Sequence, residues 1–247
     1  MCACEDHFGM AKVEVPESVL QTLAKCSTTT IWGTLSQAGI QNTFMEGVLP
    51  RTSKQNFAGT AQTLRTLPTR GDVAKAIQGR PNPHRASFAT VGKNQVVVID
   101  ARGDHGTGVL GDIFAQSILT RGGVALVTDG AVRDLPAMEE VGLPVYTPAG
   151  NAGAFNTRHI GAELNVPVQC AGVLVIPGDV LVGDSSGVIV IPQAMAAEVA
   201  EKSWETEVRD GYSRMRVAEG APLNEAFPMG EKMRAEYAEW RKSHPNG

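Results

Sequence analysis

The alternation of apolar and polar positions predicts a βαβα unit in the middle of the chain. Residues 96–99 form a short apolar run that ends at Asp100, as expected of a buried strand. A glycine-rich loop, a helix-like segment at 112–120 and a second apolar run at 124–127 follow, before a third strand near Val145. Ligands in open α/β sheets bind at the carboxyl ends of the strands, so we place the candidate site at that edge.

In the segments before this unit, the spacing of apolar residues changes from a helical period to the alternation of a strand. Residues 16–39 predict two helices, the first starting at Pro16-Glu17 and the second capped by Ser27 or Thr28. Residues 57–64 alternate as in a strand. Residues 71–90 predict a helix that is interrupted by a loop at 79–83.

The segments after the unit predict loops, strands and then helices. Residues 149–165 are rich in turn formers, so we expect a surface loop near the site. Residues 166–192 contain short apolar runs separated by turns, which predicts a compact meander of three strands. An amphipathic helix is expected over 193–208, and a last helix carries Met233, Tyr237 and Trp240.

Composition and charge narrow the class of protein. The 247 residues are 43% hydrophobic and 19% charged, which suits one sizeable core. A net charge of −4 argues against nucleic-acid binding. The chain has no apolar run of 18 residues, so we expect no membrane span. Its first ten residues lack a basic region followed by an apolar one, so we expect a cytoplasmic location.

Asp112, Arg133 and Asp134 are the strongest candidates for chemistry. Twenty residues lie between Asp112 and Arg133, the length that one helix and one strand need to return to the same sheet edge. Carboxylates can hold a hard cation such as Mg²⁺, and arginine offers a planar fork to a carboxylate or an oxyanion. The structural alternative is that both aspartates cap helices and that the arginine forms a surface ion pair.

The glycine loop predicts an anion site and does not have the pattern of a nucleotide site. Its amides and the following helix N-terminus would suit a small 2-oxo acid. The loop departs from a dinucleotide fingerprint and lacks the lysine of a P-loop. His105 in this loop is a candidate acid or base, or else a substrate contact. Lys75 and Lys93 lack the apolar surroundings of a Schiff-base lysine.

The combined motifs resemble a known family. Leu-Gly-Asp at 110–112, Asp-Gly-Ala-Val-Arg-Asp at 129–134 and the strand-rich string at 172–192 resemble the family of the regulator of ribonuclease activity A. That RraA-like family includes class II 4-hydroxy-4-methyl-2-oxoglutarate/4-carboxy-4-hydroxy-2-oxoadipate aldolases. Residues 27–40 and 59–64 resemble its N-terminal part. The likeness covers roughly residues 20–195.

The resemblance implies a role for each candidate residue. Asp134 would ligate a divalent cation, Mg²⁺ or Mn²⁺, and Asp112 would hold metal-bound water. Arg133 would bind the keto oxygen and stabilise a pyruvate enolate, while the backbone around Leu110 and Gly111 would take the carboxylate. The full set of expected substrate-binding residues is Gly108, Leu110, Gly111, Asp112, Arg133 and His105.

The resemblance also implies an architecture and an assembly. We expect an α/β fold, a swivelling ββα three-layer sandwich, with residues 1–195 as the RraA-like catalytic domain. Residues 196–247 would be a helical extension packing on the core or on a neighbouring subunit. Family members assemble as trimers or hexamers with sites between subunits. This chain lacks acidic residues that the family often has, at 31–34 (Ile-Trp-Gly-Thr) and at Ala137. Those positions belong to the outer pocket and the proton relay.

Three functions follow from these expectations. The first is a divalent-metal-dependent lyase that cleaves a 2-oxo acid to release pyruvate, by retro-aldol reaction or by oxaloacetate decarboxylation. The second is a non-catalytic protein that binds and regulates ribonuclease E. The third is a lyase acting on a different, sugar-acid-derived 2-oxo acid, with residues 31–34 setting the specificity.

Overall fold

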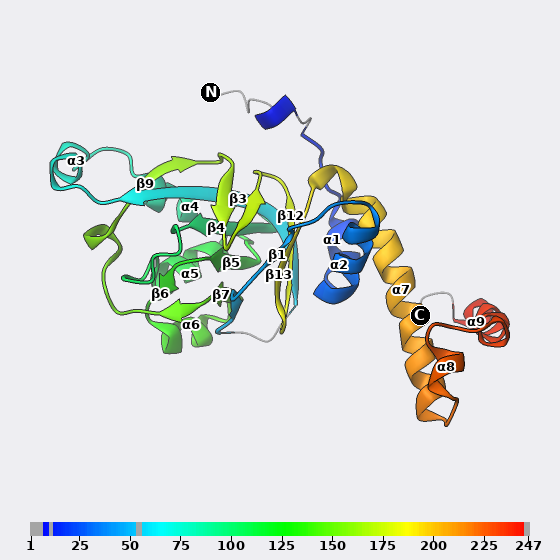
Figure 1. Cartoon of the computed structure of the whole chain (residues 1–247). Coiled ribbons are helices and arrows are strands. Elements are labelled where there is room, and N and C mark those ends of the chain that lie inside the picture. The colour runs from blue at the N-terminus through cyan, green and yellow to red at the C-terminus, as the bar shows by residue number, and fades with distance from the viewer. Residues whose placement is uncertain (1–6, 10–11, 53–55, 245–247) are drawn as a thin grey trace.

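The computed structural model describes residues 7–9, 12–52 and 56–244 (Figure 1). The helices are η1 (His7–Gly9), α1 (Glu17–Leu23), α2 (Thr28–Gln37), α3 (Gly71–Ala76), α4 (Pro83–Thr90), α5 (Asp112–Thr120), α6 (Leu135–Val141), η2 (Phe155–Thr157), η3 (Gln193–Met195), α7 (Ala196–Ala218), α8 (Leu223–Ala226) and α9 (Glu231–Ser243). The strands are β1 (Phe44–Met45), β2 (Leu49–Pro50), β3 (Phe57–Pro68), β4 (Gln95–Asp100), β5 (Ala125–Thr128), β6 (Ala131–Val132), β7 (Val145–Thr147), β8 (Ala149–Gly150), β9 (His159–Leu164), β10 (Val168–Cys170), β11 (Val173–Val175), β12 (Val180–Asp184) and β13 (Gly187–Ile191).

A mixed sheet forms the centre of the molecule. Its order is β1-β13-β12-β3-β4-β5-β7-β2, and β9 pairs with the second half of β3. The strands β3, β4, β5 and β7 run parallel, whereas the pairs at both ends are antiparallel. The carboxyl ends of β4 and β5 therefore lie side by side, as the apolar runs at 96–99 and 124–127 predicted. The loops that leave these two ends carry the candidate site.

Both faces of the central strands are buried, which explains their continuous apolar runs. Val97 and Ile99 pack under α4, α5 and α6, together with Phe88 of α4 and Ile118 of α5. Val96 and its neighbour two residues on face the opposite core, which the β10–β11 hairpin covers. The result is an α/β sandwich of a helical layer, a large sheet and a small β layer, which confirms the predicted fold class.

Two sequence predictions for the second half of the chain were wrong. Residues 166–192 do not form one meander of three strands: β10 pairs with β11, and β12 and β13 join the main sheet as a second hairpin. Residues 149–165 are not only a loop, because β9 pairs with β3 through residues 159–164. Both differences involve β3, which has 12 residues and pairs along one edge with β12 and with β9. Such long-range pairing leaves no signal in the local sequence.

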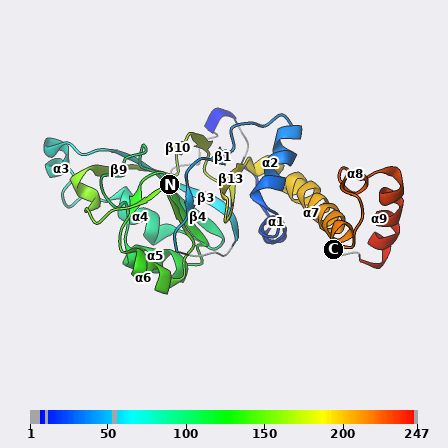
Figure 2. The ribbon, with the colours of Figure 1, turned by 60° about the horizontal axis from the view of Figure 1, so that its bottom comes forward.

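The last helices form an arm that projects from the body (Figures 1 and 2). The start of α7 packs on α1 and α2, where Ala196, Val199 and Ala200 join a core shared with β12 and β13. Further along, Tyr212 of α7 packs with residues of α8 and α9 in a small separate cluster. The helix predicted over 193–208 thus runs on to Ala218. Within the described residues, no helix is both long and apolar enough to cross a membrane.

Candidate active site

The glycine loop lies directly against the segment that carries Arg133 and Asp134. The Val109 amide donates to the Ala131 carbonyl at 2.8 Å, and the Arg133 amide donates to the Leu110 carbonyl at 3.0 Å. A Cβ at Gly108 would stand 2.9 Å from Arg133 Cβ. Only glycine permits this approach, because real Cβ atoms essentially never come so close to another heavy atom. The backbone therefore brings the two predicted motifs together.

Asp134 adopts a backbone conformation that residues other than glycine rarely adopt. Its φ and ψ are 60° and 34°, in the left-handed region, at the start of α6. Its side chain makes no capping hydrogen bond there, although the structural alternative required one. Instead, Arg133 Nε donates to Asp134 Oδ2 at 2.9 Å, and both side chains are about two-fifths exposed. The backbone of Asp134 is therefore strained. Its carboxylate lies close to the glycine loop, since a Cβ at Gly111 would be 2.5 Å from Asp134 Oδ2.

Asp112 begins α5, and Gly111 rather than Asp112 occupies the cap position. Neither aspartate side chain therefore makes a capping hydrogen bond, although Asp134 stands at the cap position of α6. Arg133 does form the partly exposed ion pair that the structural alternative predicted. Among the hydrogen bonds of the described residues, the amides of Leu110, Gly111 and Asp112 donate to no backbone or side-chain acceptor. Since α5 has nine residues, these free N–H groups stand at the positive end of a helix dipole. They form an anion cradle next to Arg133.

A pocket of about 350 Å³ opens beside this cradle. Its lining includes four predicted substrate-binding residues: Gly108, Leu110, Gly111 and Arg133. The other lining residues are Asn82, His84, Arg85, Val109, Phe114, Ala154, Phe155 and Asn156. Asp112 and Asp134 adjoin the pocket through Gly111 and Arg133 but do not line it. The lining contains no carboxylate, so the pocket suits an anionic ligand.

His105 lies outside this group of lining residues. Its side chain is exposed, and Nε2 donates to the Asp129 carbonyl at 3.1 Å. The side-chain amide of Asn151 donates to the His105 backbone carbonyl at 2.9 Å. The structure thus uses His105 to tie the glycine loop to its neighbours and does not bring it into the pocket with Arg133. Its predicted part in substrate binding remains a prediction.

His84 lines the pocket and was missed from the sequence. It is 5% exposed, and its Nε2 donates to the Val109 carbonyl at 2.6 Å. Its ring stacks on Phe155 with the centroids 3.7 Å apart. Burial lowers the pKa of His84 to about 4, so the ring is neutral near pH 7. His84 therefore joins α4 to the loop that carries the free amides. The residues that follow it, Arg-Ala-Ser-Phe-Ala-Thr at 85–90, form no apolar run, so nothing local pointed to burial or to Val109.

The donor set near Arg133 fits a hard divalent cation. Asp134 keeps one carboxylate oxygen free of Arg133, and Asp112 has no hydrogen-bond partner within the described part of the chain. Within those same residues, no cluster of three or more His, Cys, Asp or Glu side chains exists. That excludes a closed zinc site there. Two carboxylates suit Mg²⁺ or Mn²⁺ as a donor set, since Mg²⁺ usually takes one or two carboxylates and keeps several of its waters.

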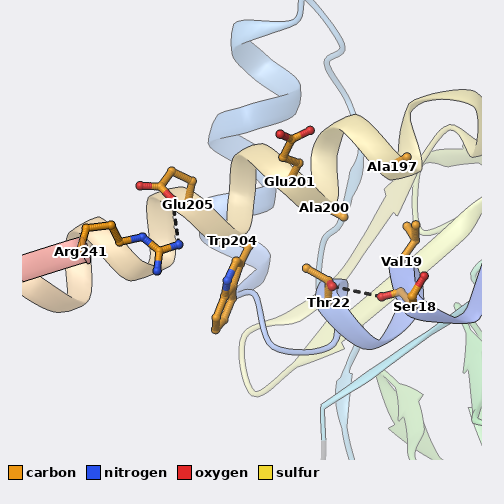
Figure 3. Close-up of a pocket in the computed structure, with 9 residues that line it drawn as sticks. All are labelled: Ser18, Val19, Thr22, Ala197, Ala200, Glu201, Trp204, Glu205 and Arg241. Atoms are coloured by element: carbon orange, nitrogen blue, oxygen red, sulfur yellow. Dashed lines mark hydrogen bonds and ion pairs between the residues drawn. The ribbon is translucent and has the colours of Figure 1, made fainter. Parts of the chain in front are cut away.

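A larger hollow lies far from this chemistry, between α1, α7 and α9 (Figure 3). It has a volume of about 530 Å³ and includes Trp204, Glu205 and Arg241. The Arg241 guanidinium pairs with Glu205 at 3.3 Å, so the charges satisfy each other. Its lining includes two carboxylates, Glu201 and Glu205, which would disfavour an anionic substrate. We therefore keep the smaller pocket as the candidate site.

The two positions where the family often has acidic residues lie in different places. Ala137 is on α6, three residues after Asp134. The segment 31–34 is on α2, and within it Trp32 is 52% exposed. Because α2 packs on β12 and β13, it lies at the other end of the sheet from β5 and β7. Within one chain, Trp32 therefore cannot complete the pocket beside Arg133.

Comparison with known sequences gives partial matches. A protein of Halalkalibacterium halodurans, provisionally named 4-hydroxy-4-methyl-2-oxoglutarate aldolase, is 36% identical over 132 residues, which cover 53% of this chain and 62% of that protein. Protein DlpA of Legionella pneumophila is 27% identical over 231 residues, covering 91% of this chain and 36% of DlpA. The chain thus spans less than two thirds of the length of either relative.

Comparison with solved structures supports the fold. An uncharacterized protein from Pseudomonas syringae has a TM-score of 0.78 at 24% identity, covering 88% of this chain and 96% of that one. Streptomyces coelicolor RraAS2, described as an unusual member of the RNase ES inhibitor RraA protein family, has a TM-score of 0.74 at 29% identity. That match covers 82% of this chain and 100% of RraAS2.

The strongest evidence of identity is a match to a family description. The family described as RraA-like, Aldolase/RraA, matches residues 28–190, which contain the glycine loop, Arg133 and Asp134. The matched segment agrees with the range of roughly 20–195 that the sequence motifs indicated. The sandwich fold and the meeting of both motifs beside one pocket agree with this family assignment. This chain belongs to the RraA-like family.

Proposed function

We propose that this protein is a divalent-metal-dependent lyase that cleaves a C–C bond of a 2-oxo acid and releases pyruvate. One observation carries the proposal. Arg133 lines a pocket that has no carboxylate in its lining, beside the free amides at the start of α5, and it pairs with Asp134, which adjoins the pocket. Neither aspartate side chain makes a capping hydrogen bond, which leaves carboxylate oxygens of both residues open to a cation. Relatives named as aldolases support the reaction class.

The protein groups divide the substrate between them. The amides of Leu110 and Gly111 bind the carboxylate next to the keto group, with help from the α5 dipole. The Arg133 guanidinium donates to the keto oxygen, where negative charge develops as the bond breaks. Because Asp134 holds Nε of Arg133, the remaining N–H groups of the fork are oriented before substrate arrives. This orientation is most useful as the enolate forms.

Asp134 and Asp112 would hold the cation, directly and through water respectively. When bound, a divalent cation acts as a Lewis acid that stabilises charge on the keto oxygen. Asp112 would keep its water in place without a competing hydrogen bond, because its side chain has no partner among the described residues. Arg133 would also limit repulsion between the two carboxylates and an incoming anion.

We also propose that the working form is a homotrimer or homohexamer. Trp32 is exposed on α2 and lies at the far end of the sheet from the pocket of its own chain. A residue at this position could reach a pocket only in another copy. Ile113, next to Asp112, is 78% exposed, which leaves an apolar side chain at the edge of the site for a neighbour to cover.

A second candidate function is binding to a ribonuclease E-type enzyme as a regulator. The observation that favours it is the likeness to Streptomyces coelicolor RraAS2, whose description names an RNase ES inhibitor family. That function would need a binding surface and no cation. It would also leave the free amides and the strained Asp134 without a use, so we rank it below the lyase.

The test is pyruvate release from a panel of 2-oxo acids, including oxaloacetate and 4-hydroxy-2-oxo acids. We expect turnover with Mg²⁺ or Mn²⁺, loss of turnover in excess EDTA, and recovery when the cation is restored. Full turnover in chelator would exclude the metal-dependent mechanism. If wild-type protein released no pyruvate from any member of the panel, the lyase proposal would fail and the regulator would become the leading candidate.

A further inference from the structure

His84 of α4 lines the same pocket as Arg133. The lining also contains two arginines, which stay protonated, and two asparagines, which do not ionise. Its remaining residues are glycines or apolar residues. Among the lining residues that the structure describes, His84 is therefore the only one whose side chain can accept a proton from a ligand.

The hydrogen bond of His84 decides which ring nitrogen is free. Nε2 lies 2.6 Å from the Val109 carbonyl oxygen, which can only accept, so Nε2 carries the ring proton and Nδ1 keeps a lone pair. No described residue donates to Nδ1, yet Nδ1 is not one of the sealed side-chain atoms without a partner, whereas His159 Nε2 is. Nδ1 is therefore open to solvent. Because His84 is 5% exposed and lines the pocket, a ligand reaches Nδ1 from the pocket.

The position of His84 is fixed by the elements around it. Its amide donates to Asn82 Oδ1 at 2.9 Å, and its carbonyl accepts from Ser87 Oγ at 2.7 Å. A Cβ at Gly161 of β9 would stand 2.6 Å from the His84 nitrogen, so α4 lies as close to β9 as glycine permits. Phe155 stacks on the ring with the centroids 3.7 Å apart. The ring is thus oriented before a ligand binds, as a catalytic group needs to be.

The surroundings of His84 keep the ring neutral in the free protein. Burial lowers its pKa to about 4, the bond to Val109 opposes this shift, and the charges of Arg85 and His159 add to it. A ligand carboxylate in the same pocket would offset the positive charges of Arg85 and Arg133 and raise the pKa of His84. The ring is therefore unprotonated when an anionic substrate arrives and becomes a stronger base once the substrate is bound. A general base needs both properties.

We propose that His84 is the general base of retro-aldol cleavage and that its Nδ1 accepts the proton of the substrate's C4 hydroxyl. The inference rests on the proposed lyase function. As the proton passes to Nδ1, the O–H electrons form the C4 carbonyl, the C3–C4 bond breaks, and its electrons pass to the enolate of pyruvate. Nε2 keeps its bond to the Val109 carbonyl, which stabilises the charge of the imidazolium. Return of the proton from Nδ1 to C3 completes pyruvate and restores the neutral ring.

Two substrates that release the same pyruvate enolate separate this role from a structural one. Retro-aldol cleavage of 4-hydroxy-2-oxopentanoate needs a base for the hydroxyl proton, whereas oxaloacetate loses a carboxylate that is already ionised and needs none. His84→Gln keeps a donor for the Val109 carbonyl but cannot accept a proton near pH 7. With Mg²⁺ present, this change should lower kcat for retro-aldol cleavage by about 10²–10³ and kcat for decarboxylation far less. KM for both substrates should stay within about threefold, since the loss falls on a chemical step.

Thermal melts establish that each variant is folded, and His84→Asn repeats the measurement if His84→Gln does not fold. His244→Gln is the control, since His244 is exposed beside the end of α9 and does not line the pocket. A folded His84 variant within about threefold of wild-type kcat for retro-aldol cleavage would overturn the inference, as would an equal loss on both substrates. If wild type released pyruvate from oxaloacetate alone, the inference would fail and the lyase function would stand. If wild type released pyruvate from neither substrate, the lyase function itself would fail, and the inference with it.

Discussion

Two pairs of aspartates at the same edge of the sheet have opposite surroundings. Asp100 and Asp129 end β4 and follow β5, and both are less than a tenth exposed. Asp129 accepts from the Ala101 amide at 2.7 Å and the Gly103 amide at 3.0 Å. Asp112 and Asp134 lie a few residues further along the chain, partly exposed and without backbone donors of this kind.

The difference in surroundings indicates that the buried aspartates support the fold and that the exposed aspartates are available for chemistry. The buried pair holds the start of the glycine loop by accepting its amides, and burial raises the pKa of Asp100. The exposed pair leaves its oxygens available, and Asp134 does so in a strained conformation. In sequence, all four are simply aspartates at strand or helix ends. The comparison predicts that the first pair governs stability and the second governs activity.

The largest expected effect is on stability, from Asp129→Ala. The change removes the acceptor of two backbone amides and of Gln169 Nε2, which donates at 3.2 Å. Leaving these donors unsatisfied should lower the free energy of unfolding by about 3–5 kcal/mol. Urea denaturation measures it. Glu163→Ala, which removes only an exposed pair with Arg65, should cost at most about 1 kcal/mol. Equal effects of the two variants would contradict the supporting role.

Next in size is the activity of Arg133→Lys. Lysine keeps the charge but loses the planar fork, so it cannot hold the keto oxygen in register while pairing with Asp134. Losing one preorganised donor should lower kcat by about 10²–10³, with a smaller change in KM. Steady-state kinetics and a thermal melt measure both properties. Arg121→Lys, at the exposed end of α5, is the control. A folded Arg133→Lys protein within about threefold of wild-type kcat would disprove the mechanism.

His84 should make stability depend on pH. Burial lowers its pKa to about 4, below the ordinary histidine value of 6.5, so the unfolded chain takes up the proton first as pH falls. Stability should therefore decrease between pH 6.5 and 4, by about 3 kcal/mol in total from this group. His84→Gln should remove that part, while glutamine can still donate to Val109. Denaturation at a series of pH values measures it, with exposed His105→Gln as the control. Identical pH profiles for wild type and His84→Gln would rule out this role.

The smallest expected change in stability comes from Asp134→Gly. Glycine tolerates the left-handed conformation, so the variant should be as stable as wild type or up to about 1 kcal/mol more stable. It should nevertheless lose nearly all lyase activity. Asn165→Gly is the control, because Asn165 also has a positive φ of 57° but lies outside the site. Its stability should change similarly while turnover persists. Marked destabilisation by Asp134→Gly would show that Asp134 serves the fold instead.

Much of the site could be predicted from the sequence, because its parts are local. The glycine loop, the start of α5 and the Arg133–Asp134 pair lie within one βαβα unit whose apolar runs were clear. The α4 wall could not be found in this way. His84 and Arg85 stand some 20 residues or more before the loop, in a segment with weak periodicity. Their relation to Val109 exists only after β3 and β4 pair.

The sequence by itself determined the central strands, the loop and the two residues that present charge at the sheet edge. Buried parallel strands need continuous apolar runs, and close backbone approaches need glycine, so both leave a local record. Tertiary structure alone decided which aspartates are buried, how the strands of residues 159–191 pair, and which side chains of α4 reach the pocket. These depend on contacts between residues far apart in the chain, where many pairings have similar local propensity and packing selects one.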